Sequence, residues 1–337
     1  MSIIKKLFLF FVMLLPASKL FASDLKDSAS VGMSTYSGTG DVQVYSPAFS
    51  IFKTLTSQFM LGIKMRLDAI SAASIRNGGN PVTTDAVTGA SGKEGFDDKR
   101  IAATVMGVYS DNINNLSAGV YSSDEVDYKG RSVFASYSRA FNEENTMAGI
   151  GFSQSDDEWK PTFSRELAED KRKEQKVDLS FAQMISPKWN MQFVYSYLYS
   201  EGFLSSPYHF VAQDDFSKFE NYPDKRTGKA LAIKTVNLLN EQNSMNFSYR
   251  YYDDDWDIAS HTYTLEFLRD FSDALLLGAR ARYYTQTNAN FIKPIGEYNA
   301  YDEYFASDYR MSSFDSYMLG VPLIYKLSIE GFDDIKL

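Results

Sequence analysis

Seven charged side chains occupy positions of this sequence where they could act electrostatically on a solute. They are Lys64, Arg66, Asp68, Arg250, Glu266, Arg280 and Arg282. Charged groups in such an arrangement can line an aqueous passage and favour anions, or they can pair with one another and close it. Both interpretations require elements that keep alternate side chains on one face.

Residues 58–70 show what that element is. Alternate positions carry the apolar side chains Phe59, Leu61, Ile63, Met65 and Leu67. The positions between them are more polar and include Lys64, Arg66 and Asp68. A period of two is typical of a β-strand. The segment is also long enough to cross a membrane as a strand, which takes roughly 9 to 11 residues. We therefore predict a strand with one face toward lipid and one toward a lumen.

The same pattern recurs along the chain as pairs of strands joined by short turns. Predicted strands cover residues 30–36, 43–55, 58–70, 100–110, 116–123, 131–141, 146–154, 177–185, 191–200, 231–238, 245–252, 261–268, 274–284 and 316–327. If neighbouring strands pair as hairpins, Glu266 lies diagonally across from Arg280. Pro322 cannot donate a ladder hydrogen bond, which indicates a bulge or a position near the closing seam.

Connection lengths alternate, and this predicts the fold class. Turns of about four residues lie at one end of each hairpin, and long polar segments lie at the other. The long segments are 71–98, 157–174, 201–227 and 285–314. We expect an all-β fold, an antiparallel up-and-down transmembrane β-barrel of about 14 strands, with short periplasmic turns and long external loops. A soluble β-sandwich would not segregate its long loops in this way.

Export is indicated by the first 22 residues. Lys5 and Lys6 precede an apolar run over 7–15 and a small-residue region through Ala22, the layout of a signal peptide. We expect residues 23–337 to form one barrel domain in the outer membrane of a Gram-negative bacterium. Without the signal the chain has 31 basic and 43 acidic side chains, a net charge of about −12, which argues against nucleic acid as a partner. The chain has no Cys, which excludes disulfides and thiolate chemistry.

The first long loop contains Arg76, Asn77, Gly78, Gly79 and Asn80. Gly and Asn permit positive φ and expose backbone N–H groups that could bind an anion or a sugar. The alternative is a turn cluster that folds this loop over the barrel mouth.

Asp253, Asp255 and Asp257 lie with Asp254 around Trp256 in a short external connection. Such carboxylates could hold Ca²⁺ through hard oxygen ligands, although the Gly and distal Glu of an EF-hand are absent. The alternative is a solvated acidic rim. No other cofactor is expected.

Catalysis is not expected, because His209 and His261 are the only imidazoles. Ser260 and His261 are neighbours on a predicted strand and therefore point to opposite faces, so they cannot act together as nucleophile and base.

Three stretches resemble a bacterial outer-membrane family catalogued as domain-of-unknown-function family 3570. They are Asp-Ala-Ile-Ser-Ala-Ala-Ser-Ile-Arg-Asn-Gly-Gly-Asn-Pro-Val-Thr-Thr-Asp-Ala-Val-Thr-Gly-Ala-Ser at 68–91, Glu-Asn-Tyr-Pro-Asp-Lys-Arg-Thr-Gly-Lys at 220–229, and Arg-Tyr-Tyr-Asp-Asp-Asp-Trp-Asp-Ile-Ala-Ser-His at 250–261. The resemblance covers nearly all of the chain after the signal and implies a barrel without known activity or catalytic residues. Family members usually finish on further strands. This chain ends at residues 331–337 without a terminal aromatic strand, so truncation before another hairpin would imply 16 strands.

About 14 strands is intermediate between filled eight-stranded barrels and open channels of 16 to 18 strands. We expect a narrow or gated pore for small hydrophilic solutes, with Lys64, Arg66 and Asp68 beneath a gate made by the 71–98 loop. The alternative is a structural or docking barrel with a closed lumen that binds a periplasmic or extracellular protein. In both cases outer-membrane lipid surrounds the barrel.

Overall fold

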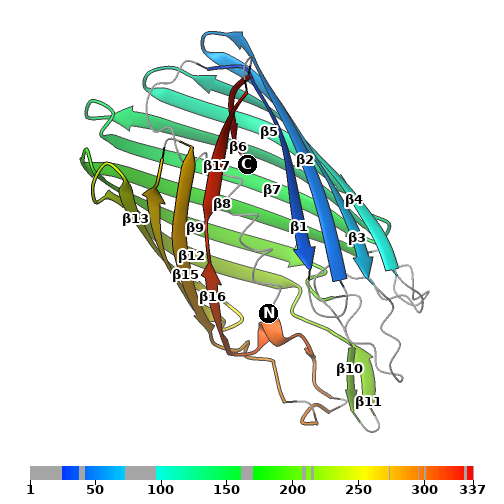
Figure 1. Ribbon diagram of the computed structural model, residues 1–337. Helices are drawn as coiled ribbons and strands as arrows, with labels where there is room; N and C mark the ends of the chain where they lie inside the picture. Colours follow the sequence, from blue (N-terminus) through cyan, green and yellow to red (C-terminus); the bar gives the residue numbers. More distant parts are fainter. Residues whose placement is uncertain are drawn as a thin grey trace.

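The computed structural model describes residues 25–37, 42–72, 96–160, 170–206, 210–213, 216–272, 274–294, 296–299, 301–329 and 332–336. One continuous antiparallel sheet dominates the chain (Figure 1). Its strands are β1 (Ser28–Ser37), β2 (Val42–Thr56), β3 (Phe59–Ala72), β4 (Phe96–Ser110), β5 (Asn114–Asp124), β6 (Tyr128–Phe141), β7 (Thr146–Trp159), β8 (Asp170–Ser186), β9 (Trp189–Gly202), β12 (Lys225–Leu238), β13 (Asn243–Asp254), β14 (Ala259–Asp270), β15 (Leu275–Gln286), β16 (Phe314–Gly320), β17 (Leu323–Ile329) and β18 (Phe332–Lys336).

From β1 to β9 and from β12 to β16 each strand pairs with its neighbour along the chain, and β9 pairs with β12 across a long connection. That connection contains a separate hairpin of β10 (Phe210–Gln213) and β11 (Phe216–Phe219). Because β16 and β17 both pair with β15, they are two halves of one interrupted strand. With β1 to β9 and β12 to β15 this gives fourteen spanning strands in the described residues, which confirms the predicted up-and-down architecture.

The break between β16 and β17 lies at Pro322. Its carbonyl accepts a 2.9 Å hydrogen bond from the Gly278 N–H, while its own nitrogen has no proton to donate. The predicted irregularity near a seam is therefore present. Residues 332–336, which the sequence leaves outside any strand, form β18 and pair antiparallel with β17, with Phe332 opposite Ile329.

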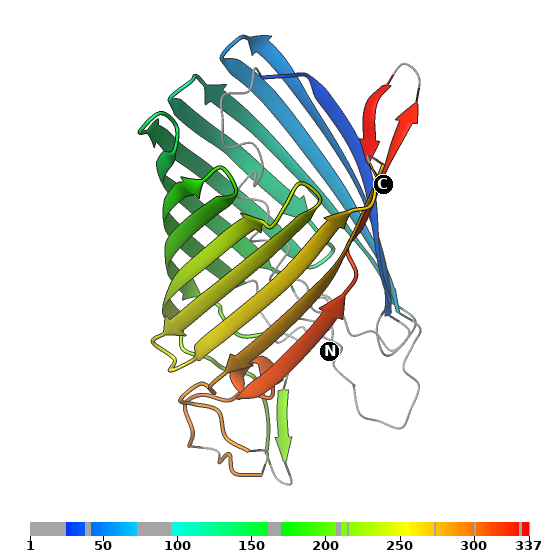
Figure 2. The same ribbon diagram turned by 60° about the vertical axis from the view of Figure 1, so that its left-hand side comes forward.

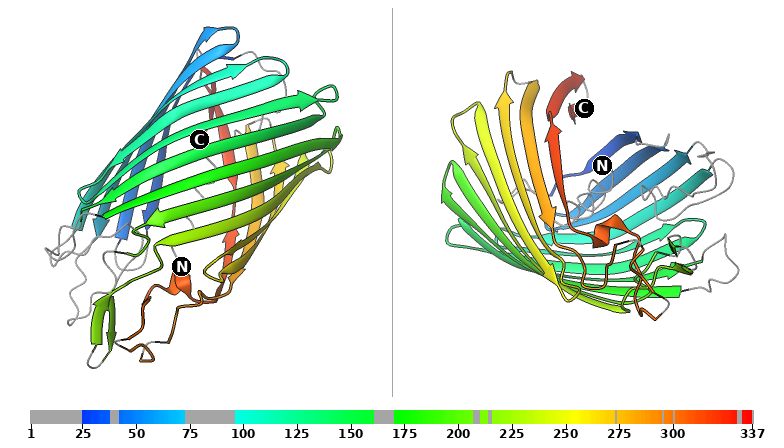
Figure 3. Two further views of the ribbon diagram at one scale, coloured as in Figure 1. Left: turned by 180° about the vertical axis from the view of Figure 1, so that it is seen from behind. Right: turned by 90° about the horizontal axis from the view of Figure 1, so that it is seen from below.

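The sheet curls into an open barrel with β1 at one edge and, at the other, β16 followed by the β17–β18 hairpin. Figure 3 shows these edges facing each other across a gap when the molecule is seen from below. In Figure 2 the β17–β18 hairpin stands apart from the other strands.

The two faces of the sheet differ as the period-two pattern predicts. On β3 the apolar row from Phe59 to Leu67 is 36 to 48% exposed, whereas Asp68 on the opposite face is 5% exposed. Outward-facing tyrosines form a belt across β13 to β16, with neighbouring ring centroids 5.0 to 6.3 Å apart. The belt consists of Tyr249, Tyr263, Tyr283 and Tyr317. Aromatic belts of this kind suit a membrane interface, where the ring is buried and the hydroxyl stays wet.

Short turns at 56–59, 110–114, 141–146, 186–189, 238–243 and 270–275 lie at one end of the sheet, which we call the short-turn end. The strand ends at which the connections 72–96, 159–170, 202–225 and 286–314 begin lie at the other end of the sheet, the long-loop end, toward the bottom of Figure 1. Within the described ranges, no helix is long and apolar enough to cross a membrane.

Candidate functional site

The inner wall of β3 and β4 carries an ion-paired cluster around Asp68. The carboxylate accepts hydrogen bonds of 2.8 Å from Arg66 Nε and of 2.8 Å from Arg100 Nε. Arg100 also lies 3.8 Å from Glu125. Lys64 is on the same face, with its Nζ 5.5 Å from the centre of the Phe52 ring. The predicted lumen residues of this strand therefore share one face, where Asp68 bridges two arginines.

On the opposite wall, Glu266 and Arg280 form a second pair. They are direct partners in the β14–β15 register, so the diagonal placement expected from the sequence is wrong. The turn between these strands fixes a register in which the two residues are opposite. Arg280 Nε donates to Glu266 over 2.5 Å, and Asn246 Nδ2 donates to the other carboxylate oxygen over 2.9 Å.

Arg250 and Arg282 lie nearer the long-loop end and contact tyrosine rings. The Arg250 guanidinium is 5.2 Å from the Tyr252 ring centre, and that of Arg282 is 6.0 Å from the Tyr284 ring centre. Thr262 is the register partner of both Arg250 and Tyr284. This part of the wall thus combines guanidinium groups with hydroxyl-bearing side chains.

Ion pairs on β7 and β8 were missed from the sequence. Arg172 donates to Asp157 over 2.5 Å, and Lys176 lies 2.8 Å from Asp178. Asp157 and Arg172 fall in the 157–174 segment, which reads as a polar loop, although both belong to strands. Alternating charges of opposite sign were the available signal, because such residues can pair across adjacent strands.

Near Trp256, as elsewhere in the described part of the chain, no group of three or more His, Cys, Asp or Glu side chains is placed to hold a metal ion. Calcium binding by Asp253, Asp255 and Asp257 stays a prediction. Asp254 has a structural role, because it pairs with Arg226 and accepts hydrogen bonds from the N–H groups of Trp256 and Ile258.

The connections 202–225 and 286–314 pack together into a folded unit that we call the cap. Its core contains Tyr222, Ala289, Ala306 and Met311, which pack with Trp256 and Ile258 of the β13–β14 connection. The short 3-10 helix η1 (Tyr309–Met311) lies within the cap. A second cluster joins Val211 to Tyr298 and Phe305. The sequence predicts only polar loops in these segments. It does not predict their packed core, because their apolar residues have no regular period.

Glu220 joins the two halves of the cap. This residue is 4% exposed and accepts hydrogen bonds from the Ser307 N–H (2.6 Å), the Ser307 hydroxyl (2.8 Å) and the Asp308 N–H (2.8 Å). The Tyr222 hydroxyl donates to it over 2.7 Å. Burial raises the pKa of Tyr222 far above its ordinary value, so this donor keeps its proton at physiological pH.

Several predicted residues fall elsewhere. Arg76 to Asn80 and His209 lie outside the described residues. His261 is on the outer face, with Nδ1 2.8 Å from the Tyr249 hydroxyl. Ser260 is 3% exposed and occupies the adjacent position, which has the opposite orientation in a strand.

The sheet, its apolar outer rows and its charged inner wall define an outer-membrane β-barrel. The chain belongs to the family described as "Protein of unknown function (DUF3570)", whose model matches residues 13–169 and 154–331. No curated protein matches the chain.

Solved outer-membrane structures are similar in overall form. An anion-selective porin from Comamonas acidovorans is 7% identical, with 88% of this chain and 98% of that chain covered and a TM-score of 0.45. A bacterial polysaccharide outer membrane secretin is 12% identical, with 88% and 94% covered and a TM-score of 0.40. The siderophore receptor PirA from Acinetobacter baumannii is 8% identical, with 80% of this chain but only 45% of the receptor covered, and a TM-score of 0.44.

Proposed function

We propose that this barrel is a narrow, gated pore for small hydrophilic solutes. The observation that supports the proposal is the inner wall, where charged and hydroxyl side chains from β3 to β15 face away from the apolar outer rows. A polar lumen surrounded by an apolar outer band is the arrangement of water-filled barrels.

The cap is the element best placed to restrict this pore. Seen from the long-loop end, the 286–314 connection turns inward from β15 and β16 and lies within the curve of the sheet (Figure 3, right). Because Glu220 accepts hydrogen bonds from both cap connections, its removal should weaken the contact between them.

Single-channel recording in planar bilayers tests the proposal. We expect small current steps from the wild-type protein and larger or more frequent openings from Glu220→Ala. Glu297→Ala is the matched control, because Glu297 is an exposed carboxylate of the same connection, and it should behave as wild type. If wild-type and Glu220→Ala proteins both carry no current, the pore proposal fails. A docking barrel with a closed lumen would then be favoured.

A further inference from the structure

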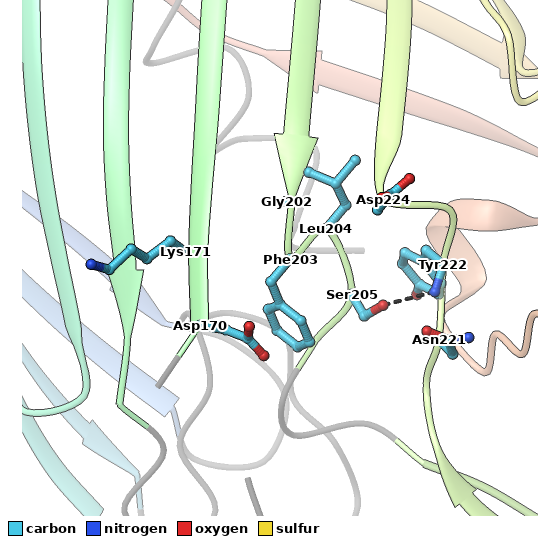
Figure 4. A pocket seen from close by; sticks show the side chains of 9 residues that line it. All are labelled: Asp170, Lys171, Gly202, Phe203, Leu204, Ser205, Asn221, Tyr222 and Asp224. Carbon is cyan, nitrogen blue, oxygen red and sulfur yellow. Dashed lines mark hydrogen bonds between the residues drawn. The ribbon is translucent and has the colours of Figure 1, made fainter. Parts of the chain in front are cut away.

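A groove of about 700 Å³ lies at the long-loop end, between the ends of β8, β9 and β12 (Figure 4). Its walls are Asp170, Lys171, Gly202, Phe203, Leu204, Ser205, Asn221, Tyr222 and Asp224. None of these residues belongs to the ion pairs of the barrel wall described above.

The backbone around the groove is held in place. The Phe203 N–H donates to the Lys171 carbonyl and the Gly202 N–H donates to the Asp224 carbonyl, each over 2.8 Å. Gly202 has φ +101°, and a Cβ there would lie 2.2 Å from the Lys171 carbonyl oxygen, so only glycine fits this close approach.

The far wall is equally fixed. The Tyr222 N–H donates to Ser205 Oγ over 2.8 Å, and the Tyr222 side chain is 7% exposed in the cap core. A ligand would therefore meet a largely preformed surface, which lowers the entropy cost of binding.

The groove offers an aromatic ring flanked by hydrogen-bond acceptors. Figure 4 places Asp170 on one side of the Phe203 ring and Asp224, next to Leu204, on the other. Both aspartates are exposed, and within the described part of the chain neither carboxylate makes a hydrogen bond or an ion pair. The Lys171 side chain extends away from the groove, toward β7, where Glu158 is its register partner.

We propose that this groove binds a neutral polyhydroxylated ring, a sugar or a chemically similar polyol. Hydroxyl groups on two sides of such a ring can donate to Asp170 and Asp224, while its C–H face packs on Phe203. Two carboxylates disfavour an anion. A single ammonium group would reach only one of two acceptors that lie on opposite sides of the ring.

Calorimetric titration of the full-length protein in detergent tests this assignment, with glucose, galactose, maltose and putrescine as probes. We expect at least one sugar to bind with a millimolar or lower Kd. Phe203→Ala and Asp170→Asn should each weaken it by about tenfold, as expected for the loss of one aromatic contact or one charge-assisted hydrogen bond. Asp156→Asn, which makes the same change on an exposed carboxylate of β7 outside the groove, is the matched control and should leave the affinity unchanged.

Asp170→Asn is a conservative change on an exposed side chain, so it separates binding from folding even if Phe203→Ala does not fold. Three outcomes would overturn the proposal: no heat from any sugar at about 50 mM, well above a millimolar Kd, heat from putrescine alone, or sugar binding that both groove variants leave intact. Binding heat does not depend on conductance, so failure of the pore proposal and failure of the sugar site are distinguishable.

Discussion

Glu266 and Arg280 face each other directly across the β14–β15 ladder, with Arg280 Nε 2.5 Å from the Glu266 carboxylate. The side chains are 11% and 38% exposed, so this pair is intermediate between a buried and a surface ion pair. We expect Glu266→Ala or Arg280→Ala to lower the free energy of unfolding by about 1–3 kcal/mol, because each leaves a charge uncompensated in the lumen.

The double variant should lose less than the two single variants combined, because both charges are then gone. Urea unfolding followed by tryptophan fluorescence measures the three values. Strict additivity would show that the pair does not couple energetically.

Asp68 should influence ion selectivity. It is the common partner of Arg66 and Arg100, so Asp68→Asn leaves two guanidinium groups without their shared carboxylate. If the barrel conducts, the reversal potential in a KCl gradient should move toward anion selectivity. Asp156→Asn, an exposed carboxylate at an outward position of β7, should leave the potential unchanged. Equal shifts from both variants would exclude a local effect of Asp68.

Asp111 should make the short-turn end sensitive to acid. Hydrogen bonds from the N–H groups of Asn114 and Ile113 hold the pKa of Asp111 below its ordinary value of 3.8. A depressed folded pKa means that the stabilising contribution is complete above the unfolded pKa and is lost as the pH falls through the folded pKa. Wild type should therefore unfold less readily than Asp111→Asn at neutral pH.

This difference in the free energy of unfolding should shrink as the pH falls below about 4. Paired unfolding curves from pH 7 to low pH measure it. A difference that stays constant with pH would contradict the assigned role of the carboxylate.

The two edges of the sheet should pair with each other in the membrane. An open edge within hydrocarbon leaves backbone N–H and C=O groups unsatisfied, and β1 runs antiparallel to the β16–β17 strand. Both edges also present exposed apolar side chains, among them Met33 at 62% and Leu319 at 87%. Because the chain has no native Cys, any disulfide that forms must join the introduced cysteines.

Met33→Cys should form an intramolecular disulfide when combined with one of Tyr317→Cys, Leu319→Cys or Val321→Cys in membrane-embedded protein. Met33→Cys with Val105→Cys should not, because β4 is three strands away, about 14 Å at the usual strand spacing and beyond the reach of a disulfide. Non-reducing gels separate the species. Disulfides formed only between two copies would show that the edges join different molecules.

The sequence by itself determined the strand architecture. Side chains of a strand alternate between faces, so the apolar row from Phe59 to Leu67 and the charged row beside it identify a membrane strand without knowledge of its neighbours. Connection lengths then supplied the topology. The sequence predicts that one strand ends at 154 and the next begins at 177, whereas β7 ends at Trp159 and β8 begins at Asp170. The charged residues Asp157 and Arg172 look typical of a loop in the sequence, because their pairing with each other is not visible there.

Only the tertiary structure decided which charges meet. Asp68 pairs with Arg100, 32 positions away, and Glu220 binds the backbone of Ser307, 87 positions away. These contacts depend on strand register and on irregular loop packing. Neither strand register nor irregular loop packing follows from a local sequence period. The ion-paired wall, the cap and the groove beside Phe203 are therefore visible only in the folded chain.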